Sequence, residues 1–458
     1  MFPVKVITLG CRLNQAESEA IIYGFKTAGY KIISPEAKIH GSGIIIINTC
    51  TVTSKADQKT RRLIRSTLSD NPEAFVILTG CYAQMNEINA PRLFIFKKDS
   101  LSAGEAKSSL LKLPEILKAS GFIQEENPNL KLLKKTLDEW IKSPCETSLF
   151  SFNPKEFSAH SRAFLKIQDG CNNCCSYCLI RIARGPGFSL DADECLERLK
   201  MLENAGYAEV MLTGVNISQY NENGHDLGGL IEKLIKGSSS IALRLGSLEP
   251  EGITEKLSSV LAHPRIRPHF HLSVQSGSEI VLKKMNRAYS LETVEKGIAL
   301  LRQAKENPFL ACDIICGFPG ETQEEFSRTI NFLEKNNFAW VHAFPYSPRP
   351  GTPAFALKSG ITEREKTNRV KLLAKLALEG RRSYGQYWLG RQLSAIVEKG
   401  DGSAKGHLRA VSENYLKLVI TGIGSNPPPK GSMIQCSPET LCEGANGDKP
   451  DAFARLLL

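Results

Sequence analysis

The segment CNNCCSYC, residues 171–178, places four cysteines within eight residues, directly after an apolar stretch typical of a β-strand, Phe164–Gln168. Zinc sites usually draw their cysteines from two pairs that lie a dozen or more residues apart. The two adjacent thiols in the middle of the segment cannot easily face one ion. Taking Cys171, Cys175 and Cys178 instead gives C-x3-C-x2-C, a loop that fits three thiolates around one cubane iron–sulfur cluster. Three ligands for four irons leave one iron open for added chemistry.

The chain around and after this loop alternates between apolar stretches and helical patterns. The expected strands are Phe164–Gln168, Glu209–Thr213, Ala242–Leu245, His269–Val274, Leu310–Cys316 and Trp340–Phe344. The expected helices are Cys195–Ala205, Gly252–Leu261, Leu291–Ala304 and Gln323–Asn336. Six β/α units are two fewer than a closed eight-stranded barrel has. The sequence therefore predicts a partial (β/α)6 barrel, whose open side would suit a large substrate.

The first eighty residues predict a separate, open parallel α/β sheet. Its expected strands are Val4–Leu9, Ile44–Ile47 and Phe75–Leu78, and its expected helices are Gln15–Gly29 and Ala56–Leu68. Each strand is followed within three residues by a cysteine, namely Cys11, Cys50 and Cys81. Ligands of such sheets bind beyond the carboxyl ends of the strands, so we expect these three thiols at one edge.

The carboxyl-terminal part of the chain is basic and changes pattern. Residues 361–410 hold eleven Lys and Arg against five Asp and Glu, which is more than half of the net charge of +10. A long basic helix, Glu363–Gly380, is followed by short strand-like stretches that resemble a small β-barrel. Clustered positive charge indicates a polyanionic partner, and nucleic acid is the first candidate.

Basic and aromatic residues alternate in RRSYGQYWLGR, residues 381–391. Guanidinium and aromatic planes can stack on unpaired bases and bind phosphate, and the same residues can equally cap a domain interface. The predicted RNA-binding residues here are Arg381, Arg382, Tyr384, Tyr387, Trp388 and Arg391.

Length and composition describe an ordinary multidomain protein. With 458 residues, two or three domains are expected. We divide the chain into an N-terminal α/β domain at 1–155, of which 91–155 is poorly patterned, a barrel domain at 156–385 and a small β-barrel at 386–458. No apolar run approaches the ~20 residues that span a bilayer, and the amino terminus predicts a strand, so we expect a cytoplasmic protein without membrane contact. Its thirteen cysteines then favour metal or redox chemistry over disulfides.

Several motifs together resemble the methylthiotransferase branch of the radical S-adenosylmethionine (SAM) enzymes. The segments that carry the resemblance are TLGCRLNQAESEA, INTCTVTSKADQKTRRLIR, ILTGCYAQ, IQDGCNNCCSYCLIRIARG, TGVNISQY, RLGSLEP, SVQSGSEIVLKKMNR, DIICGFPGET and FPYSPRPGTPA. They cover residues 1–90 and 160–390 closely, and the last 70 residues loosely, as a TRAM-type RNA-binding β-barrel.

The resemblance implies two [4Fe–4S] clusters and SAM as cofactors. Cys171, Cys175 and Cys178 would hold the radical SAM cluster, and the three N-terminal cysteines would hold an auxiliary cluster. An electron from the first cluster would cleave SAM to a 5′-deoxyadenosyl radical, and a sulfur at the second, methylated by another SAM, would be transferred to the substrate carbon. No catalytic side chain is assigned beyond the cluster ligands. The residues expected to contact SAM are Tyr177, Gly214, Asn216, Arg244, Ser247, Glu249, Gln275 and Asp313.

Within this branch, the motifs look most like the class that acts on N6-threonylcarbamoyladenosine at position 37 of tRNA. The segments GCRLNQ, TVT and ADQK resemble that class, and Arg349 in YSPRPGT fits the tRNA classes better than the protein class. The expected reaction is methylthiolation at C2 of the adenine, with the tRNA anticodon loop, an unidentified electron donor and a sulfur source as partners. The alternatives are isopentenyladenosine-37 of tRNA, an aspartate of a ribosomal protein, and a non-catalytic cysteine-rich RNA-binding protein.

Two departures from the branch pattern stand out. Cys174 occupies a position where an aromatic residue is usual, so a fourth thiol crowds the cluster loop. The segment from about 91 to 150 lacks the pattern expected at the end of the first domain.

Overall fold

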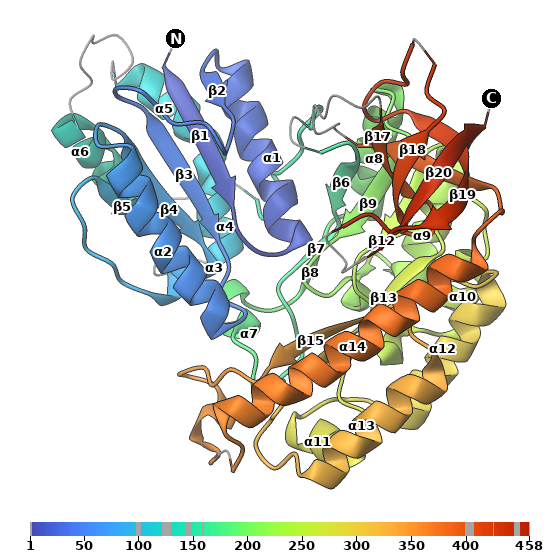
Figure 1. Ribbon diagram of the computed structural model, residues 1–458. Helices are drawn as coiled ribbons and strands as arrows, with labels where there is room; N and C mark the ends of the chain where they lie inside the picture. Colours follow the sequence, from blue (N-terminus) through green and yellow to red (C-terminus); the bar gives the residue numbers. More distant parts are fainter. Residues whose placement is uncertain are drawn as a thin grey trace.

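The computed structural model describes residues 2–97, 102–120, 130–142, 148–157, 160–358, 360–398, 407–424, 426–443 and 449–457. Three parts follow one another along the chain. Figure 1 shows the N-terminal sheet (blue) beside a central layer of strands and helices (green to orange), with a small barrel (red) at the carboxyl end.

The N-terminal part is a five-stranded parallel sheet of strand order β2-β1-β3-β4-β5. Its strands are β1 Pro3–Thr8, β2 Lys31–Ile33, β3 Ile44–Thr49, β4 Phe75–Gly80 and β5 Leu93–Ile95. Its helices are α1 Arg12–Thr27, α2 Ser54–Asp70, α3 Cys81–Met85, α4 Ala103–Ser109, α5 Leu113–Ala119 and α6 Leu130–Lys142, with a 3-10 turn at Leu110–Lys112. The predicted open sheet is confirmed, and β2 and β5 extend it on both sides.

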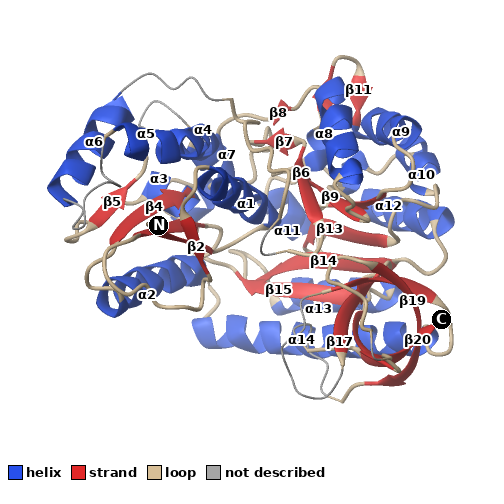
Figure 2. Ribbon diagram, turned by 90° about the horizontal axis from the view of Figure 1, so that it is seen from above, coloured by secondary structure: helices blue, strands red, loops and turns tan. Residues whose placement is uncertain are grey.

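Both faces of this sheet are covered, which explains its continuous apolar strands. Ile44 and Ile46 of β3 pack with α1 and the helices after β5, whereas Ile45 and Ile47 pack with α2 on the other face. Figure 2 shows α1 and α2 on opposite sides of the strands. All four isoleucines are completely buried, and each such burial contributes about 1.5–3 kcal/mol.

The poorly patterned segment after residue 90 belongs to this core. Leu110, Leu113 and Leu117 are fully buried against the first face of the sheet, together with Leu133 and Leu137 of α6. The sequence prediction treated this region as helix and loop at the end of the first domain. The structure adds that short helices pack there through these leucines.

The central part is an open half-barrel of six parallel strands. They are β6 Ala163–Lys166, β9 Glu209–Thr213, β12 Ala242–Leu245, β13 His269–Gln275, β14 Phe309–Cys316 and β15 Trp340–Pro345. Two three-stranded sheets, β12-β9-β6 and β13-β14-β15, are joined by single parallel bridges, Leu243 to Ile266 and Leu248 to Leu272. The predicted partial barrel is confirmed. One difference is that the first strand breaks at Ile167, and Gln168–Asp169 (β7) pairs antiparallel with Phe188–Ser189 (β8).

Helices cover the outside of this half-barrel. They are α8 Ala192–Asn204, α9 Leu227–Gly237, α10 Glu255–Leu261, α11 Glu279–Lys284, α12 Leu291–Ala304 and α13 Gln323–Asn336, whereas the short α7 Ile180–Arg184 contacts α3 and α4 of the N-terminal part. A two-stranded hairpin, β10 Asn221–Glu222 and β11 His225–Asp226, precedes α9. Threonine, serine and aspartate side chains cap most of these helices at the amino end, as Thr322 does for α13.

The carboxyl-terminal part begins with the long helix α14, Glu363–Tyr387, which lies along β15 (Figure 1). A closed five-stranded barrel follows, with the order β16-β17-β18-β20-β19. Its strands are β16 Leu393–Val397, β17 Leu408–Ser412, β18 Lys417–Thr421, β19 Met433–Leu441 and β20 Ala452–Leu457. The predicted small barrel is therefore confirmed.

Among the helices within the described ranges, none combines the length and the apolar character needed to cross a membrane.

Candidate active site

The cysteine loop 171–178 follows β7 at the carboxyl end of the half-barrel strands. It is anchored by Gly170, whose φ of +69° is a left-handed conformation. A Cβ atom at this position would lie 1.7 Å from the carbonyl oxygen of Pro186. Only glycine allows the loop to approach this backbone so closely, and the amide of Cys171 then donates to Gly185 O at 3.2 Å.

Hydrogen-bond donors point at the sulfurs of this loop. The amide of Asn173 lies 3.4 Å from Cys171 Sγ, and the amide of Ile180 lies 3.4 Å from Cys178 Sγ. Arg287 Nη1 donates to Cys175 Sγ at 3.0 Å. Burial raises the pKa of the Cys178 thiol to about 12, so a metal that binds this thiol must displace its proton.

Cys174 differs from the three other cysteines of the loop. Its side chain is exposed, and Arg181 Nη1 donates to its sulfur at 3.1 Å. Cys175, by contrast, is buried. The structure therefore separates Cys174 from the three thiols that the spacing selects.

The three N-terminal cysteines meet at one edge of the first sheet. Cys50 follows β3 and Cys81 begins α3, at the ends of neighbouring strands whose last residues pair as Thr49 with Gly80. Cys11 caps α1 beside them. Burial raises the pKa of Cys50 to about 12, and the nearby Cys11 and Cys81 sulfurs act in the same direction. The three thiols are therefore close neighbours, as the topology predicts.

A buried ionic network, which the sequence prediction missed, joins the two groups of cysteines. It consists of Glu17 on α1, Lys107 on α4, Lys166 on β6, Asp169 on β7 and Arg184 on α7. Arg184 Nη1 lies 3.0 Å from Glu17 Oε1 and 2.9 Å from Asp169 Oδ1. All five side chains are at most 2% exposed. The network spans the junction between the N-terminal sheet and the half-barrel.

The charges of this network are not balanced within it. Two carboxylates face three cations, and Arg184 also acts electrostatically on Cys11 and Cys81. Burial opposes the ionisation of Glu17, but Arg184 and the two lysines hold its pKa well below its ordinary value. Burial raises the pKa of Cys11 and Cys50, and the positive charge of Arg184 acts against that rise. Asp169, in turn, precedes Gly170 and the other cysteine loop.

Three of the predicted SAM contacts gather near the loop. Asn216 Nδ2 lies 3.8 Å from Cys171 Sγ, and its side-chain oxygen is buried without a hydrogen-bond partner in the described part of the chain. Glu249 pairs with Arg287, the residue that also touches Cys175. Tyr177 lies within the loop itself. Arg287 was not predicted, although it ends the quoted segment SVQSGSEIVLKKMNR.

The other predicted SAM contacts lie elsewhere around the strand ends. Ser247 Oγ and Asp313 Oδ1 flank His271, at 2.7 Å from Nδ1 and 3.2 Å from Nε2 respectively. Gln275 ends β13 with a φ of +66°. Gly214 leaves room for Gln168, whose carbonyl oxygen would lie 2.9 Å from an added Cβ.

Arg244 differs from its predicted role as a partner of the SAM carboxylate. Its guanidinium is completely buried, and it pairs with Glu209 at 2.7 Å and donates to Ser412 O of the terminal barrel at 3.2 Å. The strand-end position suggested by sequence therefore serves the contact between the half-barrel and the terminal barrel.

Most of the predicted RNA-binding residues have protein partners. Arg381 is 4% exposed and pairs with Asp451, and Arg349 is 6% exposed and pairs with Asp57 at 2.7 Å. The hydroxyl of Tyr384 donates to Asn307 O at 3.0 Å. The remaining members of the motif lie at the end of α14 or just beyond it: Arg382 is exposed, Tyr387 and Arg391 contact Glu306, and Trp388 packs on the core of the terminal barrel.

A basic face that the sequence prediction did not single out lies on α2. Arg61, Arg62 and Arg65 are exposed and line a surface hollow with Gln58 and Ser66. Among the residues that the structure describes, no carboxylate pairs with any of these three arginines. The spacing of three and four residues places Arg61, Arg62 and Arg65 close together on the helix surface.

The residues present fit two iron–sulfur clusters. Each site offers three cysteines at the ends of strands, with donors to sulfur at one site and an uncompensated cation at the other, as thiolate-held clusters require. Over the described ranges, no three His, Cys, Asp or Glu side chains converge closely enough to hold a single metal ion.

Comparisons with known proteins agree with this geometry. Residues 165–333 match the radical SAM superfamily, and residues 3–95 match a family described as uncharacterized protein family UPF0004. The threonylcarbamoyladenosine tRNA methylthiotransferase MtaB of Treponema pallidum is 38% identical over 95% of this chain and 98% of its own length. The MtaB protein of Aquifex aeolicus is 34% identical over 91% and 96%. A tRNA-2-methylthio-N(6)-dimethylallyladenosine synthase of Anaplasma marginale is 30% identical over 95% and 93%.

The half-barrel with its cysteine loop thus defines a radical SAM enzyme, a class that uses a [4Fe–4S] cluster and SAM. Because relatives that span nearly the whole chain are methylthiotransferases, the protein belongs to the radical SAM methylthiotransferase family.

Proposed function

We propose that this protein methylthiolates C2 of N6-threonylcarbamoyladenosine at position 37 of tRNA, to give the 2-methylthio derivative. Support for the substrate comes from identity, since relatives named for threonylcarbamoyladenosine reach 38% and 34% and range down to 30%, against 30% and 29% for two relatives named for dimethylallyladenosine. The observation that carries the reaction is the pair of cysteine triplets on the two sides of one buried ionic network.

In this proposal Cys171, Cys175 and Cys178 hold the radical SAM cluster, and Cys11 and Cys50, with Cys81, hold an auxiliary cluster. When bound, the clusters and SAM supply the radical chemistry, the sulfur and the methyl group. The division of the chain at 1–155, 156–385 and 386–458 is part of the same proposal, as are an electron donor and a sulfur source.

The protein's own residues position and shield the two centres. The network of Glu17 and Arg184 holds the N-terminal sheet against the half-barrel, so the two groups of thiols keep a fixed relation. Arg287 binds both Cys175 and Glu249, which links the loop to the carboxyl end of β12. Such fixed geometry is what a reaction between separately bound groups needs.

The basic face of α2 supports an RNA substrate. Its helix begins four residues after Cys50, and its exposed arginines follow seven to eleven residues further along the helix. Phosphate groups of an anticodon stem–loop are natural partners of unpaired arginines. Unpaired loop bases can be splayed out from such a stem into an enzyme cleft.

The experiment that tests this function is mass spectrometry of tRNA nucleosides from a deletion strain and its parent. We expect loss of 2-methylthio-N6-threonylcarbamoyladenosine and accumulation of its unthiolated precursor. Loss of the methylthio-isopentenyl nucleoside instead would keep the enzyme class and overturn the substrate. No change in any tRNA nucleoside would overturn the tRNA function and favour a ribosomal protein or a non-catalytic role.

A further inference from the structure

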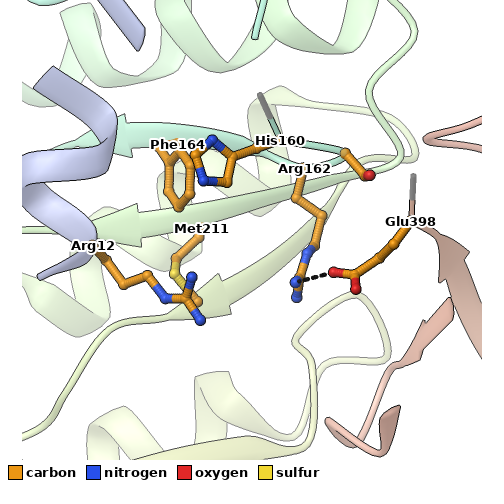
Figure 3. A pocket seen from close by; sticks show the side chains of 7 residues that line it. Arg12, His160, Arg162, Phe164, Met211 and Glu398 are labelled. Carbon is orange, nitrogen blue, oxygen red and sulfur yellow. Dashed lines mark hydrogen bonds and ion pairs between the residues drawn. The ribbon is translucent and has the colours of Figure 1, made fainter. Parts of the chain in front are cut away.

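A pocket of about 200 Å³ lies where the three parts of the chain meet (Figure 3). Arg12 reaches it from the first turn of α1, Phe164 and Met211 belong to β6 and β9, and Glu398 follows β16. The remaining lining residues are His160, Ser161 and Arg162. Because Arg12 directly follows Cys11, the pocket begins one residue from a proposed ligand of the auxiliary cluster.

Two arginines dominate the polar lining of this pocket. Arg162 is engaged by carboxylates, since it lies 3.1 Å from Glu398 and 3.7 Å from Glu209. Arg12, by contrast, donates only to neutral oxygens, those of Gln15 at 3.0 Å and Tyr415 at 2.8 Å. Within the described part of the chain, no carboxylate pairs with Arg12, and its side chain is exposed. Its charge is therefore available to a ligand.

The surroundings of the pocket carry a positive potential. Burial alone would raise the pKa of Tyr415, yet Arg12, Arg162 and Arg244 hold it below its ordinary value. The same positive charges that favour the ionised form of Tyr415 would stabilise an anionic ligand in the pocket.

Apolar side chains form the rest of the pocket lining and favour a ligand that is apolar in part. Figure 3 shows the rings of Phe164 and His160 side by side, with Met211 between them and the Arg12 guanidinium. A volume of about 200 Å³ has room for about seven water-sized groups. These features suit a small ligand that has one anionic end and an apolar portion.

We propose that this pocket receives the threonylcarbamoyl group of the substrate base and that Arg12 binds its carboxylate. The inference rests on the proposed function and names the residue that distinguishes this base from others. A planar guanidinium recognises a carboxylate through paired hydrogen bonds. An apolar dimethylallyl group in the same place would cover the charge of Arg12 without pairing it, which disfavours that substrate.

Binding of defined RNAs to the cluster-loaded full-length protein tests this inference. The probes are anticodon stem–loops with threonylcarbamoyladenosine at position 37, with its carboxyl methyl ester, and with unmodified adenosine, each measured by fluorescence anisotropy. We expect the free acid to bind ~10–100-fold more tightly than the ester or adenosine, as one charged hydrogen-bonded pair provides. The Arg12→Gln variant should bind all three RNAs with similar affinity.

A matched control separates this effect from general RNA binding. Arg65→Gln on α2 removes an exposed cation and should weaken all three RNAs by the same factor. Iron content is measured in each variant because Arg12 neighbours Cys11. The comparison of acid and ester needs no substitution, so it tests recognition of the carboxylate even where the Arg12 variant loses iron.

The outcomes distinguish the inference from the function on which it rests. If the parent protein binds acid and ester equally, or if Arg12→Gln with full iron keeps the parental preference, the inference is wrong while the tRNA function stands. If the parent protein binds none of the RNAs and the deletion strain keeps its methylthio nucleosides, the proposed function itself fails.

Discussion

Replacing Glu17 by Gln should destabilise the protein more than replacing Arg184 by Met, although Arg184 makes as many contacts. In the parent protein, three buried cations face the carboxylates of Glu17 and Asp169. Glu17→Gln leaves three cations against one carboxylate. Arg184→Met leaves two lysines against two carboxylates, which is a balanced set of charges.

The magnitude follows from the cost of an uncompensated buried charge, about 3–5 kcal/mol. For a cooperative unit of 150–250 residues, 1 kcal/mol lowers Tm by about 2–4 °C. We therefore expect Glu17→Gln to lower the Tm of the N-terminal part by about 6–20 °C. Arg184→Met should cost less, and the double variant, which restores the parental net charge, should recover part of the loss through a coupling of about 0.5–3 kcal/mol.

Calorimetry of the cluster-free protein measures these shifts, and hydrogen exchange of the α1 amides identifies the transition of the N-terminal part. Glu232→Gln is the matched control, because Glu232 pairs with Lys236 on the exposed face of α9, where the loss of an ion pair should leave the Tm almost unchanged. An Arg184→Met variant with a Tm at or below that of Glu17→Gln would refute the charge-balance reasoning.

Three further predictions concern acid stability and the cysteine sites. Buried arginines hold the pKa of Glu209 at about 2, below its usual 4.5, so its contribution of about 3 kcal/mol is complete above pH 4.5 and lost as the pH falls towards 2. The free energy of unfolding of the Glu209→Gln variant, measured as a function of pH, should therefore not show this loss between pH 4.5 and 2. Cys174→Ser should keep the iron content of the reconstituted protein and its SAM cleavage, whereas Cys175→Ser should lose about half of the iron. Gly10→Ala should disturb the auxiliary site alone, because the new Cβ would lie 2.4 Å from Cys50 Cβ, and a lowered iron content with intact SAM cleavage would confirm it.

The sequence predicted the fold well wherever local pattern and burial coincide. The strands Glu209–Thr213 and Ala242–Leu245 have the predicted bounds, because they are short, continuous and buried on both sides. Helix α9, Leu227–Gly237, was missed, since its two early glycines weaken a helical pattern that tertiary packing nevertheless completes. Leu110 and Leu117 were missed as core residues for a related reason, because they lie on helices too short to show a clear period.

The candidate site shows the same contrast between features that the local pattern predicts and buried features that it does not. The two groups of cysteines were predicted because each follows a recognisable strand, and parallel topology brings strand ends together. The ionic network was not predicted, because in a single sequence a charged residue such as Glu17 or Lys107 is expected to be exposed. Their partners lie as much as 167 residues apart, in the case of Glu17 and Arg184. Only the packed structure reveals that these charges are buried.

Net charge along the chain also says little about how much of that charge is unpaired at the surface. The basic excess of residues 361–410 indicates a polyanionic partner, but Arg369 and Arg381 of that segment are buried in pairs with Glu321 and Asp451. Paired charges of this kind hold helix α14 in place and contribute little to the attraction of a polyanion. The exposed arginines of α2 lie within residues 41–90, where five Lys and Arg stand against four Asp and Glu, and they carry no such partner among the described residues. Attraction of an RNA depends on unpaired exposed charge, so the α2 face and Arg12, both close in the chain to cysteines of the auxiliary site, are where we expect the substrate to be drawn in.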